Sequence, residues 1–429
     1  MRYALLFASL LVVPALHAQG FDPRPGAGSP AASGAVFSSP RVSGTFFTPT
    51  AYRGAFEPGG TRWDLPWANY TPRTTDYGSS TTGVTVLSGT LATRTLTTGS
   101  RYKLSGFVRV PSGAVLTIQP GVVIFGEQAT TGTLVVERGG QIRALGTADQ
   151  PVVFTSERPV GQRNNGDWGG VIIAGRASIN LPGGEGVIEG GTGTTYGGGA
   201  APNDADDSGT LRYVRIEFAG IAFSPNNEIN SLTLGAVGSG TTIEYVQTSY
   251  GGDDSFEWFG GTVNARYLIA QANVDDMFDG DIGWRGNVQF ALGLSDPGIA
   301  DVSSSNGFEQ DNDPTGTANA PVTSPTFSNV TILGPRTQTS GTINPLFSRV
   351  AHLRRNTRTS IFNSVLLGFP IGVLLDGAAT NGNATNGSLV VQGTLVTGTP
   401  PVRDNLGASG ADTGAALAYF NGQAGNAVL

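Results

Sequence analysis

Two adjacent blocks of this chain align without a gap. Residues 245–266 read YVQTSYGGDDSFEWFGGTVNAR, and residues 267–288, at an offset of 22, read YLIAQANVDDMFDGDIGWRGNV. The blocks share an initial tyrosine, a pair of aspartates, and a phenylalanine followed by an acidic residue. A third, looser copy, NGFEQD, occupies residues 306–311. Self-similarity at a short fixed period is typical of a solenoid.

The residues within the repeat decide which solenoid this is. The blocks show neither the L-x-x-L-x-L frame of leucine-rich repeats nor the i, i+3, i+4 apolar spacing of helical repeats. They show short apolar runs rich in β-branched residues, separated by Gly, Asn and Asp, which is typical of strands joined by tight turns. We therefore predict an all-β fold, a parallel β-helix (solenoid) in which each block forms one coil.

Stacked coils place equivalent residues about 4.8 Å apart, so the repeat predicts ladders of like side chains. The expected ladders are an internal aromatic one and two polar columns: Phe256, Phe278 and Phe308; Glu257, Asp279 and Glu309; and Asp254, Asp276 and Asn306.

A column of carboxylates predicts a bound cation. Unit charges at this spacing repel by roughly 1 kcal/mol in water and by more at a buried site. Hard divalent ions, above all Ca²⁺, take six to eight such oxygens. Seven acids lie between residues 253 and 281 with Arg266 as the one basic residue in that span. The alternative is that these residues form turns, since Asp and Asn bond their own backbone. The predicted ligands are Asp253, Asp254, Glu257, Asp275, Asp276, Asp279, Asp281, Glu309, Asp311 and Asp313.

The start of the chain predicts export. Residues 1–18, MRYALLFASLLVVPALHA, have one Arg, an apolar run and a small final residue, as in a secretory signal peptide. No later stretch is apolar enough to cross a membrane, and without cysteine the chain has no disulfide. A net charge of −7 argues against nucleic-acid binding. We expect an extracellular or cell-surface protein.

Composition divides the rest of the chain into three parts. Residues 19–99 are rich in Pro, Gly, Ser and Thr but contain the motif YRGAF at 52–56, with Trp63 and Trp67 after it. This density of aromatic residues predicts an extended arm or cap that covers another surface. The β-helix is expected over residues 100–399, followed by a Gly/Ala-rich tail at 400–429.

The chain resembles a family of exported proteins found in Bacteroidota and some proteobacteria. The resemblance covers roughly residues 105–370 and is carried by WGGVIIAGRASIN, SGTLRYVRIEFAGIAFSPNNEIN, LTLGAVGSGTTIEYVQ, DDSFEWFGGTVNARYLI, DDMFD and SNGFEQDND. It implies a right-handed parallel β-helix of the pectate-lyase-like superfamily and export, with no established activity. In that family a segment like YRGAF follows the β-helix, whereas here it precedes the β-helix.

This departure raises the question of where the arm packs. If the arm of one chain completes the end of the next, residues 45–77 would join chains into a homopolymer, since a heterologous contact that does not close builds filaments. The arm could equally pack on its own chain.

Three function classes remain open. The sequence favours a structural surface protein over a carbohydrate-binding module with Trp258 and Trp284 as an exposed platform. It favours an enzyme least. A calcium-dependent polysaccharide lyase would use Arg285 as base, but residues 19–429 contain one histidine, His352, which we interpret as structural. For the cluster of Arg349, Arg354, Arg355 and Arg358 we expect a solvated face, with neutralisation of the acidic column or contact with an acidic ligand as the alternatives.

Overall fold

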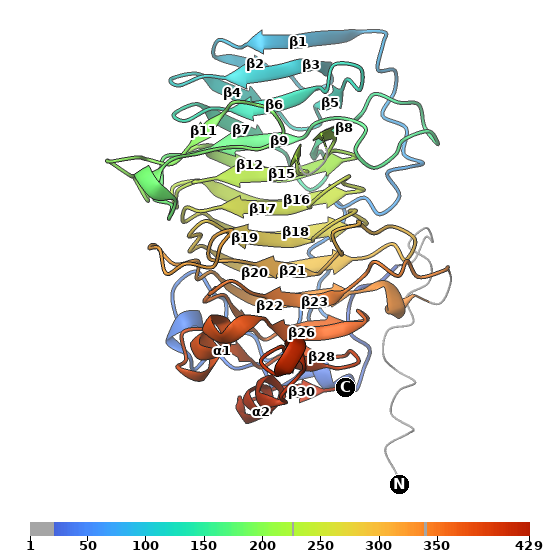
Figure 1. Ribbon diagram of the computed structural model, residues 1–429. Coiled ribbons are helices and arrows are strands. Elements are labelled where there is room, and N and C mark those ends of the chain that lie inside the picture. Colours follow the sequence, from blue (N-terminus) through green and yellow to red (C-terminus); the bar gives the residue numbers. More distant parts are fainter. Residues whose placement is uncertain (1–20, 225–226, 339–340) are drawn as a thin grey trace.

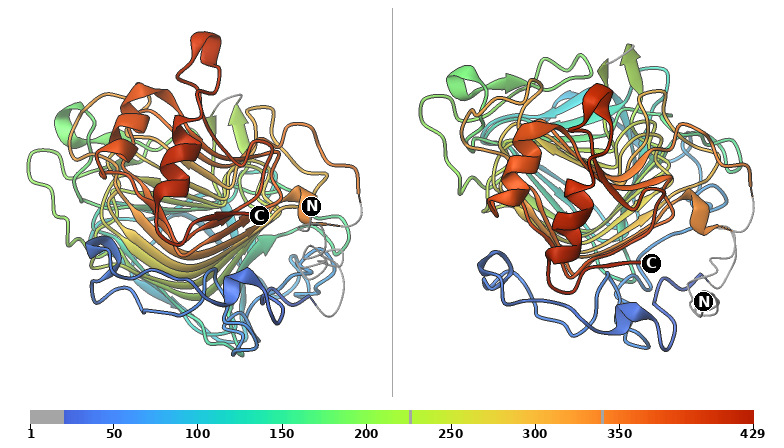
Figure 2. Two further views of the ribbon diagram at one scale, coloured as in Figure 1. Left: turned by 90° about the horizontal axis from the view of Figure 1, so that it is seen from below. Right: turned by 60° about the horizontal axis from the view of Figure 1, so that its bottom comes forward.

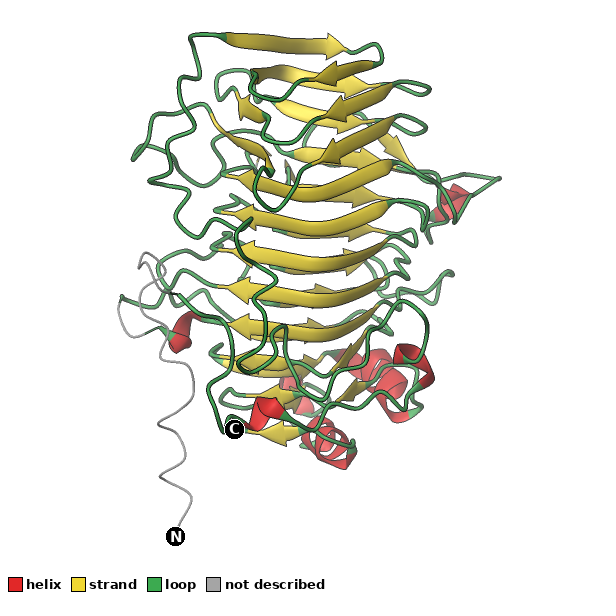
Figure 3. Cartoon of the chain, turned by 180° about the vertical axis from the view of Figure 1, so that it is seen from behind, coloured by secondary structure: helices red, strands yellow, loops and turns green. Residues whose placement is uncertain are grey.

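The computed structural model describes residues 21–224, 227–338 and 341–429. Twenty-six parallel strands form a β-helix, which confirms the predicted fold class (Figure 1). The strands stack along one axis into an elongated column (Figure 3).

The β-helix has three faces. The arm sheet contains β1 (Val84–Thr90), β3 (Arg101–Val110), β5 (Val123–Gly126), β8 (Val152–Ser156), the second halves of β12 (Gly209–Glu217), β16 (Thr242–Ser249), β18 (Asn264–Gln271), β20 (Asn287–Leu294) and β22 (Thr326–Leu333), then β25 (Val365–Leu367), β28 (Leu395–Val396) and β30 (Ala427–Val428).

The side sheet contains β2 (Arg94–Leu96), β4 (Val115–Ile118), β7 (Gln141–Leu145), the first halves of β12, β16, β18, β20 and β22, then β24 (Ser360–Phe362) and β27 (Val391–Gln392).

The acid sheet contains the end of β3, then β6 (Thr133–Val136), β9 (Val171–Ala174), β15 (Leu232–Gly235), β17 (Phe256–Phe259), β19 (Phe278–Asp281), β21 (Phe308–Gln310), β23 (Arg349–Leu353), β26 (Ile371–Leu375) and β29 (Val402–Asp404).

The remaining elements lie in loops or at the C-terminal end. They are the hairpins β10 (Gly186–Val187) with β11 (Thr195–Tyr196) and β13 (Ala222–Ser224) with β14 (Asn227–Glu228), the helices α1 (Gly377–Thr385) and α2 (Ala415–Gly422), and the short 3-10 helices η2 (Pro30–Ala32), η3 (Pro40–Val42), η4 (Pro182–Gly184), η5 (Pro335–Thr337) and η6 (Ala408–Gly410). Among the described residues, no helix is long and apolar enough to cross a membrane.

The matching tyrosines of the repeat form the corner between the side sheet and the arm sheet. Tyr213, Tyr245, Tyr267 and Phe290 all adopt the left-handed conformation, with φ between 51° and 62°. This conformation turns each strand from one sheet into the next and points the ring outward. The rings of Tyr245 and Tyr267 stack with centroids 4.4 Å apart. The residues whose rings stack along the corner are therefore the same residues whose backbone is in a conformation that non-glycine residues rarely adopt.

The aromatic ladder predicted for the core is confirmed. Phe256 pairs with Phe278 and Phe278 with Phe308, and their ring centroids lie 5.8 and 5.5 Å apart.

The predicted exposed platform of Trp258 and Trp284 is wrong, because both side chains are fully buried and stack 4.3 Å apart in the core. Gly280, the register partner of Trp258, explains this: a Cβ there would lie 2.7 Å from the Trp284 ring. The glycine leaves room for a ring that enters from the following turn.

Both predicted ends of the β-helix were misplaced. β1 and β2 belong to the first coil, so the β-helix begins at Val84 rather than at residue 100. The tail at 400–429 contributes β29, α2 and β30, and α2 packs Ala416 and Phe420 onto the core. The two helices cover the C-terminal end of the β-helix (Figure 2).

Amide side chains on both sides of the tyrosine corner bind the backbone of the arm, residues 21–83. Gln289 accepts a hydrogen bond from the Thr48 N–H at 2.8 Å and donates one to the Thr48 carbonyl at 2.7 Å. Gln247 does the same with Asn69, at 2.8 Å for both bonds. A side-chain amide used in this way replaces the partner that a neighbouring strand would supply.

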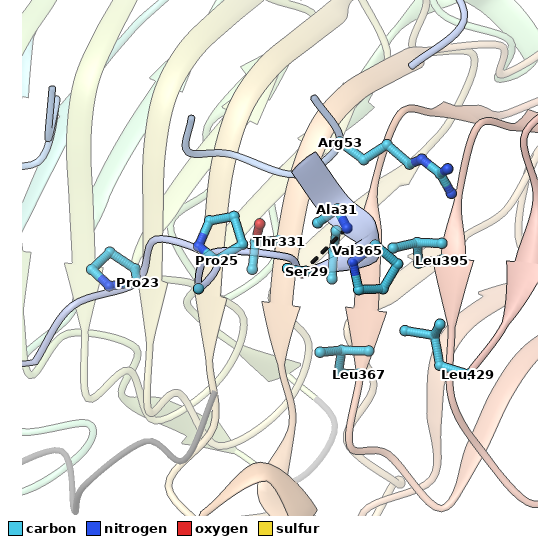
Figure 4. A pocket seen from close by; sticks show the side chains of 12 residues that line it. Pro23, Pro25, Ser29, Ala31, Arg53, Thr331, Val365, Leu367, Leu395 and Leu429 are labelled. Carbon is cyan, nitrogen blue, oxygen red and sulfur yellow. Dashed lines mark hydrogen bonds between the residues drawn. The ribbon is translucent and has the colours of Figure 1, made fainter. Parts of the chain in front are cut away.

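The aromatic residues of the arm pack on the corner stack. Trp67 is fully buried, and its ring lies edge-on to Tyr213 and Tyr245, with centroids 6.1 and 6.0 Å away. Nearer the C-terminal coils, Pro25 and Ala31 of the arm face Val365 across a small apolar recess (Figure 4). The arm therefore covers its own chain, along one side of the β-helix (blue in Figure 2). Homopolymer formation through residues 45–77 stays a prediction and would require this segment to leave its own chain.

We predict that Trp67→Ala lowers the free energy of unfolding by about 3–5 kcal/mol, the usual cost of removing a fully buried aromatic side chain. Leu65 lies in the same arm but is 51% exposed, so Leu65→Ala should cost less than about 1 kcal/mol. Urea titrations of both variants measure the difference. Equal effects would mean that the arm does not dock on the corner stack.

Candidate cation site

The predicted carboxylate column exists on the outer face of the acid sheet. Glu257 on β17, Asp279 on β19 and Glu309 on β21 pair in register. They alternate with the inward phenylalanines, because successive side chains of a strand point to opposite faces. The turn before each strand supplies the second column.

The turn aspartates bond the next coil. The Asp276 N–H donates to Asp254 Oδ1 at 2.7 Å, and the Asn306 N–H donates to Asp276 Oδ1 at 2.5 Å. One oxygen of each aspartate therefore accepts a backbone N–H bond in the turn. This is the turn-forming role that was predicted as the alternative to metal binding. The role is compatible with a cation, since a carboxylate has a second oxygen.

Carboxylates from adjacent coils converge. In three groups, one oxygen from each acid lies within 4.8 Å of the others: Asp253, Asp254 and Asp275; Asp254, Glu257 and Asp279; and Asp276, Asp279 and Glu309. Asp254 and Asp279 each belong to two groups, so the groups form one continuous cluster, the acid cluster.

Burial and mutual repulsion raise the pKa of these carboxyls. Burial is the larger cause and neighbouring carboxylates the second for Asp253, Asp254, Glu257, Asp276, Asp279 and Asp281, whose pKa values lie well above the ordinary range. Burial also raises the pKa of Asp275 to about 7, although Ser303 donates it a hydrogen bond at 2.7 Å. In the described parts of the chain, none of these seven acids forms an ion pair.

One further acid near the cluster, Glu189, could not be predicted from the repeat pattern. Glu189 lies in the loop between β10 and β11, and it shares Asn230 with Glu257: the Asn230 amide donates to Glu189 Oε1 at 3.4 Å and to Glu257 Oε2. Burial raises the pKa of Glu189. Glu189 lies far from the repeat in sequence and outside any strand, so periodicity could not place it.

A family comparison agrees with the β-helix fold. The model of the pectate-lyase-like β-helix domain matches residues 89–416. The chain belongs to this family. Neither the curated proteins nor the solved structures that were searched contain a match to the chain.

Towards its C-terminal end, the acid sheet of this pectate-lyase-like β-helix compensates its acids with arginine. Arg354 forms ion pairs with Glu309 and with Asp311, the second at 2.8 Å. Arg355 pairs with Asp311 as well, also at 2.8 Å. Burial raises the pKa of Glu309, but the hydrogen bond with His352 and the charge of Arg354 leave it below the ordinary value. The prediction of a solvated arginine face is wrong for Arg354, which directly follows β23 and takes the alternative role of neutralising the acid column, whereas Arg355 stays 41% exposed while it pairs with Asp311.

His352 has a defined place in this network. Its Nε2 lies 2.8 Å from Asp376 Oδ2 and its Nδ1 lies 3.4 Å from Glu309 Oε2. It is buried and in register with Glu309. These contacts support the structural interpretation of this histidine.

Three predicted site residues lie apart from the converging groups. Asp313 accepts hydrogen bonds from Thr315 and Thr317 within its own loop, as a turn former does. Asp281 and Asp311 each lie two residues beyond a member of the column, Asp279 and Glu309, and Asp311 is paired with arginine.

Arg285, the candidate lyase base, pairs with Asp204 at 3.0 Å and donates to Ser178 at 2.8 Å. The structure gives it no ion pair with the acid cluster among the described residues.

The raised pKa values predict that, in metal-free buffer, the free energy of unfolding falls as the pH rises, the opposite of the usual effect of paired carboxylates. Between about pH 4 and pH 7 the folded cluster binds more protons than the unfolded chain, so the free energy of unfolding should fall as the pH rises through this window. Urea titrations at several pH values in EDTA measure it. Asp275→Asn should reduce the slope, whereas Asn at the exposed Asp149 should not. A stability that rises with pH in EDTA would contradict the buried, uncompensated cluster.

Proposed function

We propose that this chain is an exported surface β-helix stabilised by Ca²⁺ bound to the acid cluster. One observation carries the proposal: six acids that converge on the coils of β17 and β19 have no ion-pair partner in the described residues, while Glu309 and Asp311 on the next coil have arginine partners. Such a cluster is stable only if it is protonated or neutralised by a cation.

The ligand chemistry favours a hard ion. Every converging side chain offers carboxylate oxygen, the chain has no cysteine, and its histidine near the site is held by Asp376 and Glu309. Ca²⁺ accepts mono- and bidentate carboxylates in flexible geometry and takes six to eight oxygens, whereas softer metals select nitrogen and sulfur. Three carboxylates from two adjacent coils would hold one ion between them.

The proposed ion has a structural role. Each converging group joins acids from neighbouring coils, so a bound ion would link β17 to β19 and β19 to β21 across the sheet surface. Arg354 links the coils of β21 and β23 in the same manner, through its bonds to Glu309 and Asp311.

Export and surface location are supported by the sequence of residues 1–18, which lie outside the described residues.

A second candidate function is binding of an acidic polysaccharide through the ion. The side chains of Asp275, Asp279 and Asp281 are partly exposed, and Oδ1 of both Asp275 and Asp281 accepts no hydrogen bond in the described structure. An ion there would keep coordination positions open to a carboxylate of the polysaccharide. A lyase activity has less support, because Arg285 pairs with Asp204 and Arg354 is occupied by two acids.

Calcium titration of the purified protein tests the proposal. At 100 times the dissociation constant, Ca²⁺ should raise the free energy of unfolding by about 2.7 kcal/mol, and EDTA should reverse the gain. The variant Asp254→Asn/Asp279→Asn should lose this response, because it removes charge from all three groups. Asn keeps an acceptor oxygen for the Asp276 N–H, so the turn is preserved.

Asp149→Asn, at an exposed site, is the control and should respond to Ca²⁺ like the natural chain. A natural chain whose unfolding is unchanged by Ca²⁺, with no binding heat in calorimetry, would refute the proposal. Retained calcium in the variant would place the ion elsewhere.

A further inference from the structure

We propose that two copies of this chain join head to head through the open edge of β1, as an antiparallel two-fold dimer. β1 pairs with β3 along one edge and, among the described residues, with no other strand. It is the outermost strand at the N-terminal end of the β-helix (Figure 1). Its other edge presents unpaired backbone N–H and C=O groups.

From Val84 to Ser88, before the register with β3 shifts, the edge lacks the usual protection against pairing. Natural edge strands carry charges, prolines or covering segments. The sequence of β1, VTVLSGT, contains neither charge nor proline, and Val86 points outward with 59% of its surface exposed. Thr85 is exposed although its register partner, Tyr102, is buried in the core. Within the described ranges, no further coil therefore covers this end.

The opposite end differs in a way that selects the symmetry. There α2 covers the core with Ala416 and Phe420, and the last strand of the arm sheet, β30, has two residues. A second copy therefore cannot continue the solenoid by placing its β1 on this end. The contact left is between two β1 edges. Such an isologous contact closes after two copies, so it gives a dimer and no filament.

The strand is complementary to itself in this arrangement. Antiparallel pairing about Val86 places Val86 opposite its own copy, Thr85 opposite Leu87, and Val84 opposite Ser88. No like charges meet between the strands, although each chain carries a net charge of −7. The arm and the acid cluster lie along the sides of the β-helix, so the dimer uses neither.

The oligomeric state of the full chain, measured by light scattering after size exclusion, tests the proposal. The natural chain should have twice the monomer mass, in calcium and in EDTA alike, and Val86→Lys should have the monomer mass. The outward, exposed position of Val86 should leave the fold intact, which circular dichroism checks. Val302→Lys, at an exposed loop residue, is the control and should remain dimeric.

A single cysteine gives a second, independent readout. The chain has no cysteine, and residues opposite each other in an antiparallel pair have Cα atoms about 4.5–5.5 Å apart, within disulfide range. Val86→Cys should therefore cross-link into a covalent dimer on mild oxidation, and Val302→Cys should not. A monomeric natural chain, a dimer that survives Val86→Lys, or a dimer in which Val86→Cys fails to cross-link would each overturn the proposal. Loss of the calcium response would leave it untouched.

Discussion

The structure depends on the in-register hydrogen bonding of successive coils. The parallel backbone ladder holds neighbouring strands about 4.8 Å apart and leaves each side chain directly above its equivalent in the preceding coil. Where the repeat is regular, like side chains therefore lie on like, as for Phe256 on Phe278. Phenylalanines and tyrosines gain from this, because their rings stack. Stacked carboxylates are destabilised instead, because they repel each other and cannot move apart without breaking the backbone ladder.

The same constraint explains what could be predicted from the sequence. A repeat of 22 residues was enough to place Phe256 on Phe278 and Glu257 on Asp279, since register follows directly from the offset. It failed for Trp258 and Trp284, which differ in repeat position and meet because Gly280 has no side chain. Periodicity describes strands, and this contact is made by a ring that a turn supplies.

Long-range partners were the other part that the sequence could not supply. Glu189 reaches the acid cluster through a loop, and Arg354 reaches Glu309 and Asp311 across a strand pairing whose register crosses a long insertion. The local sequence pattern does not determine where a long loop returns to the sheet, so it could not place these contacts. The arm was predicted as a covering segment from its aromatic residues, but its partners, the amides of Gln247 and Gln289, could be read only from the structure.

The arm and the acid cluster act on the same coils. In a solenoid each coil contacts its neighbours alone, so the weakest junction between coils limits the stability of the whole. Carboxylate repulsion weakens the junctions of β17, β19 and β21. Beside the arm the same coils supply β16, β18 and β20, whose Gln247 and Gln271 on the arm sheet and Gln289 just before the corner bond the arm backbone. An arm that crosses several coils cannot stay bonded if two of them separate. The β-helix thus places a covalent strap over the coils whose other face carries unpaired charge, so those charges can stay close together without parting the coils.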